Sequence, residues 1–329
     1  MRKINWGVMG TAGIAKGFTI PGMQQAENCH LYAIAGRTME KALAYQQEFG
    51  FEIAYDSYDA LLADPKVEAV YIPLPNELHH EWTLKALKAK KHVLCEKPLA
   101  PTIAQIKEMF ACAKENDVFL MEAFAYLHSP LMAAIKKELQ SGVIGDVLYM
   151  ESQFITSDYD ISNIRMRKET YGGSTYDLGC YTTSQILWLL EETPVKVQAV
   201  ADFSEEGIDT NTSGLLSFAD GKKATFICAM VLATDKDRRI DCLRIHGTQG
   251  DIYCDARFNQ CGELRYTLTV GENSVVKTVS TPQNYRLEVE QLGRCITDGE
   301  KPHVSKEFTL LNASLMEKIL DIIGYNGIS

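Results

Sequence analysis

The chain has 329 residues, 46% of them hydrophobic, so it can bury a large core and is long enough for two domains. Its 33 basic and 43 acidic side chains give a formal net charge of −10, which disfavours a nucleic-acid partner. No apolar run is long enough to cross a membrane, and we identify no signal peptide. Nine cysteines without Cys-x-x-Cys spacing favour reduced thiols and a cytoplasmic location, and no pattern predicts a metal site.

The first half of the chain alternates between predicted strands and predicted helices. Strands are expected at residues 4–9, 30–35, 69–74, 92–95 and 118–121. Helices are expected at residues 38–50 and 102–116, and a further helix opens at residues 75–79. Because the connections are short, this alternation predicts a parallel sheet with helices on both faces.

The turn after the first predicted strand partly fits a dinucleotide-binding pattern. Gly-x-Gly-x-x-Gly or Ala forms a tight turn and aims a helix N-terminus at a pyrophosphate. Gly10, Ala12 and Ala15 occupy its three small positions, with Ala12 in place of a glycine, and Gly13 is displaced by one residue. By itself the motif fits a plain strand-to-helix turn equally well.

The residues after the second predicted strand bear on the choice of cofactor. Arg37 and Thr38 stand where an NAD site usually has Asp or Glu for the ribose 2′-hydroxyl. An arginine here can pair with a 2′-phosphate, to which Thr38 can also donate a hydrogen bond. The alternative is a solvated arginine at a helix start. Together with the preceding turn, Arg37 favours NADP, with NAD possible.

The fourth predicted strand ends in Glu96-Lys97-Pro98. A short apolar run that stops at a proline is typical of a buried strand leaving its sheet. In open parallel sheets the ligand binds at this edge. Lys97 can be an ion-pair partner of Glu96 or can face a substrate. Taken alone, residues 93–98 favour the ion pair between Lys97 and Glu96. The surrounding motifs instead favour a Lys97 side chain that faces a substrate.

The second half has a different pattern. A helix ending near residue 141 and a strand at residues 147–154 precede Gly172-Gly173, which leads into a helix reaching about residue 190. Asp177 and Tyr181 are four residues apart and share one helical face, a spacing that is common on protein surfaces.

The rest of the chain is rich in strands. They are predicted at residues 196–203, 212–230 (a hairpin turning at 220–221), 239–246, 250–254, 263–270 and 274–280, and helices at 284–298 and 306–323 close the chain. Without crossover helices between its later strands, this region predicts a mostly antiparallel sheet with one open face.

Four motifs occur in order along the chain. They are Gly10-x-x-x-x-Ala15, Pro75-Asn76-x-x-His79, Lys91-His92-Val93-x-x-Glu96-Lys97-Pro98 and Met121-Glu122-Ala123-Phe124. Together they resemble the Gfo/Idh/MocA family of oxidoreductases. The resemblance implies an α/β Rossmann domain with a doubly wound parallel sheet over residues 1–123. It also implies an α+β domain with a large, mostly antiparallel open-faced sheet over residues 124–329, for substrate binding and oligomerisation.

The resemblance also implies the residues of the site. Catalytic roles are expected for Lys97, Asp177 and Tyr181, since members resembling dimeric dihydrodiol dehydrogenase and D-xylose dehydrogenase have Tyr where those resembling inositol dehydrogenase have His. Cofactor contacts are expected from Gly10, Thr11, Ala12, Gly13, Ile14, Arg37, Thr38, Pro73, Asn76, His79, Glu96 and Lys97. Further pocket candidates, each equally plausible as a residue that holds the fold, are Glu122, His128, Tyr159, Arg165 and Tyr285.

The implied reaction moves a hydride between nicotinamide and a carbinol carbon of a sugar, polyol or cyclic diol. Tyr181 would take the alcohol proton, with the Lys97 ammonium favouring its phenolate, and Asp177 would orient the substrate or Lys97. Two alternatives share the fold. An NAD-dependent glycoside hydrolase is disfavoured by Arg37, and a dinucleotide-sensing regulator without turnover by the presence of Lys97 and Tyr181. A homodimer or homotetramer is expected to cover the open sheet face.

Overall fold

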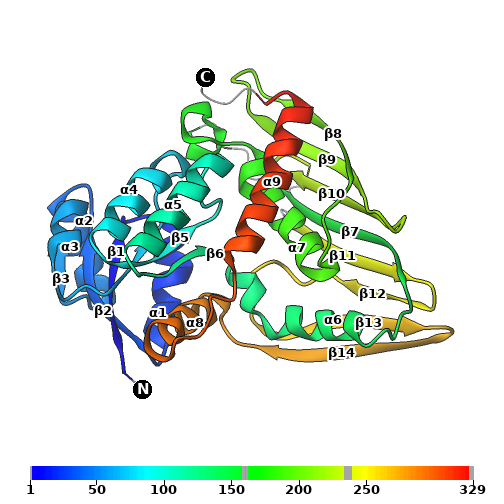
Figure 1. The fold of residues 1–329 in the computed structure, drawn as a ribbon, viewed down its shortest axis with the longest axis horizontal. Coiled ribbons are helices and arrows are strands. Elements are labelled where there is room, and N and C mark those ends of the chain that lie inside the picture. The colour runs from blue at the N-terminus through cyan, green and yellow to red at the C-terminus, as the bar shows by residue number, and fades with distance from the viewer. Residues whose placement is uncertain (1, 158–159, 161, 233–238, 326–329) are drawn as a thin grey trace. The chain divides into compact units, whose positions relative to one another are not determined.

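The computed structural model describes residues 2–157, 160, 162–232 and 239–325, which form two compact units (Figure 1). The first unit contains the chain up to residue 128 together with residues 283–310, and the second contains residues 129–282 and the chain from residue 311. The expected boundary after residue 123 did not include this return to the first unit. It arises because helix α8 (Asn284–Asp298) packs against α1 (Ile20–Gln25).

The first unit is built on a parallel sheet of six strands in the described residues. They are β1 (Ile4–Met9), β2 (Cys29–Ala35), β3 (Ile53–Tyr55), β4 (Ala69–Ile72), β5 (His92–Glu96) and β6 (Leu120–Ala123). The order is β3-β2-β1-β4-β5-β6 and every neighbouring pair is parallel. Since the order runs in opposite directions from β1 and from β4, right-handed connections place helices on both faces. The predicted doubly wound α/β fold is confirmed.

The helices of this unit follow the strands in turn. Besides α1 and α8 they are α2 (Met39–Phe49), α3 (Tyr58–Ala63), α4 (Asn76–Lys88) and α5 (Ile103–Glu115), with a π-helical turn at Ala15–Thr19 before α1 and a 3₁₀ turn at Ala125–His128. Local signals set their ends: Thr38 caps α2 by accepting a hydrogen bond from Lys41 N, and Gly50 ends it at φ +81°. β3 and α3 are not among the predicted elements, because they are too short to show a period.

The second unit is built on a sheet of eight strands in the described residues. They are β7 (Val147–Thr156), β8 (Lys196–Phe203), β9 (Asp209–Ser217), β10 (Lys223–Ala229), β11 (Arg239–Gly247), β12 (Gly250–Cys254), β13 (Gly262–Val270) and β14 (Asn273–Thr281). The order is β14-β13-β12-β11-β7-β10-β9-β8, and β7–β10 is the one parallel pair among the described strands of this sheet. The predicted, mostly antiparallel sheet is therefore confirmed.

The helices associated with this unit are α6 (Pro130–Gln140), α7 (Cys180–Leu190) and α9 (Lys306–Ile323), of which α9 begins in the first unit. Short turns lie at Ile164–Met166, Lys168–Thr170 and Thr175–Gly179. Helix α7 packs on β7 and β10, and α6 packs on β14. Met150 and Phe226 are buried, whereas Glu151 and Gln153 alternate with buried residues and lie on the opposite, open face.

Candidate active site

The turn after β1 has the backbone geometry that a dinucleotide requires. The Gly10 N–H donates to the Ala35 carbonyl at 2.9 Å, and Gly10 has φ +130°, a conformation that favours glycine. A Cβ atom at Gly10 would also lie 3.1 Å from Leu74 Cδ2. Helical backbone begins at Gly13, where an added Cβ would meet no atom within 4 Å. These residues fit a pyrophosphate that approaches the backbone and the helix N-terminus closely.

The remaining residues of the turn after β1 also leave space for a pyrophosphate. Thr11, Ala12 and Ile14 are half-buried, so all three retain exposed surface. The Ala12 carbonyl accepts hydrogen bonds from Lys16 N at 3.0 Å and from the Tyr45 hydroxyl at 3.4 Å, which hold the turn. The methyl group of Ala12 in place of the usual glycine therefore leaves the turn intact.

Arg37 and Thr38 lie directly after β2, at the same edge of the sheet as the turn. The Arg37 side chain is exposed, so a phosphate group of a bound dinucleotide can reach it. The Thr38 Oγ1 atom accepts a hydrogen bond from Lys41 N at 3.4 Å. Because that bond uses only a lone pair, the hydroxyl proton of Thr38 remains available to a ligand.

His79 is fully buried and holds two loops of the sheet edge together. Its Nδ1 atom lies 2.8 Å from the Pro98 carbonyl, and its Nε2 atom lies 2.7 Å from the Leu74 carbonyl. Pro73 is buried just before Leu74, and Asn76 is the first, half-buried residue of α4. Burial lowers the pKa of His79, with a smaller contribution from Lys97. The side chain of His79 therefore contacts the loop after β4 and the loop after β5.

Glu96 ends β5 and is buried, whereas Lys97 follows it and is half-buried. The Tyr71 hydroxyl donates to Glu96 Oε1 at 2.5 Å and accepts from Thr19 Oγ1 at 2.9 Å. Glu288 of α8 is also fully buried, and burial together with Glu96 raises its pKa well above the ordinary value. The Glu96 carboxylate thus has a tyrosine partner within the first unit.

Glu122 of β6 supports the loop that follows Lys97. Its Oε1 atom accepts a hydrogen bond from the Leu99 N–H at 2.9 Å. Burial raises the pKa of Glu122 to about 7, against smaller opposing contributions that include the Leu99 hydrogen bond and Lys97. Glu122 is therefore a residue that holds the backbone around Lys97.

In the second unit, Asp177 lies in the π-helical turn Thr175–Gly179 and Tyr181 lies in the first turn of α7. The turn is anchored by Asp209 of β9, which is fully buried. One oxygen of Asp209 accepts four hydrogen bonds at 2.7–2.9 Å, from Ser174 Oγ, Thr175 N, Thr175 Oγ1 and Thr212 Oγ1. The sequence predicts an ordinary helix here, whereas the structure has a wider π turn that this distant carboxylate holds.

Tyr181 is buried among aromatic side chains, with only 7% of its surface exposed. Its ring centroid lies 5.5 Å from that of Phe154 and 5.2 Å from that of Phe258. The Asn259 Nδ2 atom donates to the Tyr181 hydroxyl at 3.4 Å. Asn259 is not among the site residues predicted from the sequence, because nothing in its local pattern connects it with a residue 78 positions earlier.

Asp177 forms an ion pair with Arg165, whose Nε atom lies 2.8 Å from Asp177 Oδ2. The Arg165 side chain therefore lies beside Asp177, a predicted catalytic residue. His128 and Tyr285 lie in the first unit: the His128 ring centroid is 4.8 Å from that of His303, and Tyr285 is buried beside Phe18. Tyr159 lies outside the described residues.

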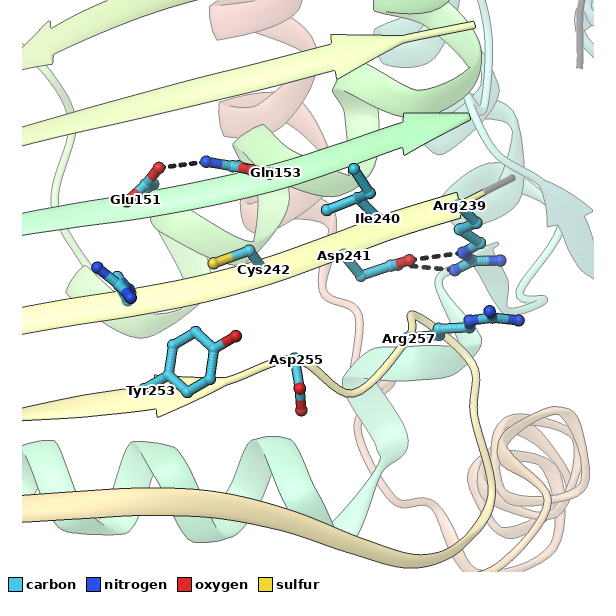
Figure 2. Close-up of a pocket in the computed structure, with 10 residues that line it drawn as sticks. Glu151, Gln153, Arg239, Ile240, Asp241, Cys242, Tyr253, Asp255 and Arg257 are labelled. Atoms are coloured by element: carbon cyan, nitrogen blue, oxygen red, sulfur yellow. Dashed lines mark hydrogen bonds and ion pairs between the residues drawn. The ribbon is translucent and has the colours of Figure 1, made fainter. Parts of the chain in front are cut away.

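A shallow pocket of about 500 Å³ lies on the sheet of the second unit (Figure 2). Its lining comes from β7, β11, β12 and the residues after β12, with three arginines and three acidic side chains among them. Figure 2 shows the Arg239 guanidinium paired with the Asp241 carboxylate at one end of this pocket.

Across the described ranges, no group of three or more His, Cys, Asp or Glu side chains is placed to hold a metal ion. Among the helices that the structure describes, none is both long and apolar enough to span a membrane. The structure places Lys97 in the first unit and Asp177 and Tyr181 in the second. That these three residues meet at one substrate stays a prediction.

Comparisons with known proteins assign the chain to a family. Residues 4–124 match the Gfo/Idh/MocA oxidoreductase model with an NAD-binding Rossmann fold, and residues 132–253 match a Gfo/Idh/MocA C-terminal domain. D-xylose 1-dehydrogenase (NADP(+)) 2 of Haloferax volcanii is 36% identical over 306 residues, which is 92% of each chain. Trans-1,2-dihydrobenzene-1,2-diol dehydrogenase of Xenopus tropicalis is 29% identical over 329 residues, covering 97% of this chain and 98% of the relative.

A solved structure extends the likeness to the whole fold. The 3-ketoreductase of Actinomadura kijaniata, crystallised with NADP and TDP-benzene, superposes with a TM-score of 0.90 at 27% identity over 98% of each chain. Of the two matched segments, residues 4–124 lie in the first unit described above and residues 132–253 lie in the second. The chain therefore belongs to the Gfo/Idh/MocA family of NAD(P)-dependent oxidoreductases.

Proposed function

We propose that this protein is an NADP-dependent dehydrogenase or reductase acting on a carbinol carbon of a sugar, polyol or cyclic diol. The observation that carries the proposal is the position of Lys97 at the carboxyl edge of a Rossmann sheet, beside a turn that fits a dinucleotide. In open parallel sheets this edge is the usual ligand site. The named D-xylose and dihydrodiol dehydrogenases among the relatives support the substrate class.

NADP would be held by the chain's own backbone and by one cation. The N–H groups near Gly13 would face the pyrophosphate, and the exposed Arg37 would pair with the 2′-phosphate. When bound, the cofactor supplies or accepts the hydride. His79 and Glu122 would keep the loops after β4 and β5 in place, because each holds the backbone there through a hydrogen bond.

Tyr181 would exchange the proton of the substrate hydroxyl at its Oη atom. The ammonium of Lys97 would favour the phenolate and would also contact the substrate oxygen. Asp177, through its ion pair with Arg165, would orient the substrate on the same side. Removing a general acid–base group typically costs about 10²–10⁴-fold in rate.

The solved ketoreductase supports the choice of these two residues. It has been crystallised with one lysine replaced by Ala or Glu and with one tyrosine replaced by Phe. The lysine and the tyrosine are the same number of residues apart in that protein as Lys97 and Tyr181 are here. This spacing supports a lysine–tyrosine pair in the present chain.

We also propose that a second copy of the chain covers the open face of the eight-stranded sheet, as a homodimer or as part of a homotetramer. Val200, Ile240 and Val276 lie on that face with 71%, 41% and 59% of their surface exposed. All nine cysteines are free thiols, which supports a reducing location such as the cytoplasm.

The test is a screen of aldoses, inositols and dihydrodiols with NADP, monitored at the absorbance of the reduced nicotinamide. Net reduction supports a dehydrogenase, whereas sugar release without net reduction would indicate a glycoside hydrolase. On the best substrate, Lys97→Met should abolish turnover while cofactor binding remains measurable. Tyr181→Phe should lower kcat about 10²–10⁴-fold with little effect on folding.

A double variant tests whether the two residues act as one unit. If they do, Lys97→Met combined with Tyr181→Phe should be scarcely worse than either single change. Lys114→Met, on the exposed face of α5, is the control for loss of a lysine. Wild-type turnover in Tyr181→Phe at every pH would show that the acid–base assignment is wrong.

A further inference from the structure

We infer that Asn259 is a positioning residue for the Tyr181 hydroxyl, and that a clamp formed by Arg239 and Asp241 holds Asn259 in place. The inference rests on the proposed function, in which Tyr181 exchanges the substrate proton. It concerns the second unit alone, since all of these residues belong to it. Asn259 lies in the connection between β12 and β13, which neither the motifs nor the proposed mechanism uses.

The clamp holds both backbone polar groups of Phe258. Arg239 and Asp241 form a two-pronged ion pair, with Nε–Oδ2 and Nη2–Oδ1 distances of 2.7 and 2.8 Å (Figure 2). The same Arg239 Nη2 atom donates to the Phe258 carbonyl at 3.1 Å, and the Phe258 N–H donates to Asp241 Oδ1 at 2.9 Å. Planar pairs of this kind restrict geometry more than a single contact does. The backbone next to Asn259 is therefore held from β11.

Aromatic packing holds the side chain of Phe258 as well. Its ring stacks on Phe154 of β7, with centroids 5.2 Å apart and planes 23° apart. The guanidinium of Arg239 lies 4.3 Å from the centroid of the same Phe154 ring. The ring of Tyr181 contacts both phenylalanines, so the loop and the tyrosine share one packed cluster.

Asn259 itself has a backbone conformation that few residues tolerate. Its φ is +61°, in the left-handed region where asparagine is several-fold enriched and β-branched or bulky residues are strained. This conformation accompanies a side chain whose Nδ2 atom lies 3.4 Å from the Tyr181 hydroxyl oxygen. Catalytic hydrogen bonds are often long before substrate binds. An N–H donor at this oxygen favours phenolate over phenol and selects the direction of the remaining lone pairs.

The charged groups around Tyr181 are largely paired. Asp177, one turn earlier, is paired with Arg165, and on β11 Arg239 is paired with Asp241. β7 contributes the uncharged Phe154. Asp255 and Arg257 flank the loop from within its own connection, and Lys97 would join the group in the proposed active site. The Asn259 amide is therefore an uncharged donor to the Tyr181 hydroxyl oxygen. A single substitution at Asn259 can remove this donor or replace it with an acceptor.

Two variants separate the amide from the backbone. Asn259→Gly keeps a residue that adopts positive φ readily and removes the donor, whereas Asn259→Asp keeps the shape and places an acidic acceptor there. We expect Asn259→Gly to lower kcat at neutral pH several-fold and Asn259→Asp to lower it about tenfold or more. In both variants the acidic limb of the pH–kcat profile, along which the rate rises as Tyr181 loses its proton, should move to higher pH, further in Asn259→Asp. The Kd for NADP and the melting temperature should change little.

A readout without turnover makes the inference independent of the substrate. The ultraviolet titration of Tyr181, obtained by difference from Tyr181→Phe, should move to higher pH in Asn259→Asp. Asn273→Asp, at the exposed start of β14, is the control for the same chemical change elsewhere on the unit.

The outcomes also separate this inference from the proposed function. If Tyr181→Phe loses turnover but both Asn259 variants keep the wild-type kcat, pH profile and Tyr181 titration, Asn259 is not a positioning residue, and the proposed function stands. If Tyr181→Phe keeps wild-type turnover, the acid–base assignment fails and the catalytic part of the inference fails with it. The titration then still decides whether Asn259 binds the Tyr181 hydroxyl.

Discussion

Arg37 is the residue on which we base the proposed preference for NADP over NAD. It is exposed directly after the buried Gly36, and the Thr38 hydroxyl beside it already caps α2. The cap orients Thr38, while the long side chain of Arg37 can follow a phosphate without disturbing the helix. The chain thus has a cation, and no carboxylate, at the position that would meet the 2′ substituent of the adenosine ribose.

We therefore predict that Arg37→Ala raises the KM for NADP far more than the KM for NAD. A lost charge-assisted hydrogen bond is worth roughly 1.5–3 kcal/mol, which corresponds to about tenfold to a hundredfold in KM. Initial-rate measurements with both cofactors test this, with Lys114→Ala as the control for a lost surface cation. Equal effects on NADP and NAD would remove the assignment of Arg37 to the 2′-phosphate.

At the scale of elements, the end of β5 is held by its neighbours. His79 of α4 contacts Pro98 O, Tyr71 of β4 contacts Glu96, and Glu122 of β6 contacts Leu99 N. Each of these partners is buried, so each contact is made where water cannot replace it. The loop that carries Lys97 is thereby fixed by side chains from elements on both sides of its strand.

Glu122 makes this support dependent on pH. Burial raises its pKa from the ordinary 4.5 to about 7, so the folded state binds this proton more tightly than the unfolded state does. Its contribution to stability is full below the unfolded pKa and is lost as pH rises through 7. Between about pH 5 and pH 8 we expect a loss of at most about 3 kcal/mol from this group.

Urea unfolding at several pH values measures this contribution. Glu122→Gln keeps an oxygen for Leu99 N but does not titrate, so its stability should fall less between these pH values than that of the wild type. Glu115→Gln, an exposed position on α5, serves as the control. If the free energy of unfolding of Glu122→Gln fell with pH as steeply as that of the wild type, Glu122 would not be the titrating group.

At the scale of the whole molecule, the open sheet face is the surface that we propose binds a second copy of the chain. The alternation of side chains along β14 places Val275 and Val276 on opposite faces, although both are exposed, at 54% and 59%. Val276 shares the open face with Ile240 of β11, and Val275 does not. The two valines therefore form a matched pair for testing which face binds a second copy.

We predict that the wild-type protein sediments as a dimer, or as a pair of dimers, at micromolar concentration. Ile240→Asp and Val276→Asp should shift it towards monomer, because a two-fold interface would bury each new charge twice. Val275→Asp should leave the assembly unchanged. A wild-type monomer in analytical ultracentrifugation at these concentrations would contradict the proposed assembly.

The sequence by itself determined the two kinds of sheet and most of their elements. Strands can be recognised from short apolar runs, such as residues 4–9 and 92–95, and from the alternation of side chains along the later strands. Helix ends are marked by residues such as Thr38 and Gly50. It also located Gly10 and Lys97 at the carboxyl edge of the parallel sheet, because a strand's end follows from its own apolar run. The elements it missed, β3 and α3, are too short to repeat a period.

Only the tertiary structure decided which distant residues hold the site. The π turn before Tyr181 depends on Asp209, the amide at its hydroxyl comes from Asn259, and α8 returns to pack on α1. His79, selected from its motif, is fully buried against two backbone carbonyls. These contacts join residues far apart in the chain, and local periodicity and capping signals act only over neighbouring turns. Packing therefore determines which residue is the partner in each buried hydrogen bond, and this packing depends on the order of the strands in the sheets.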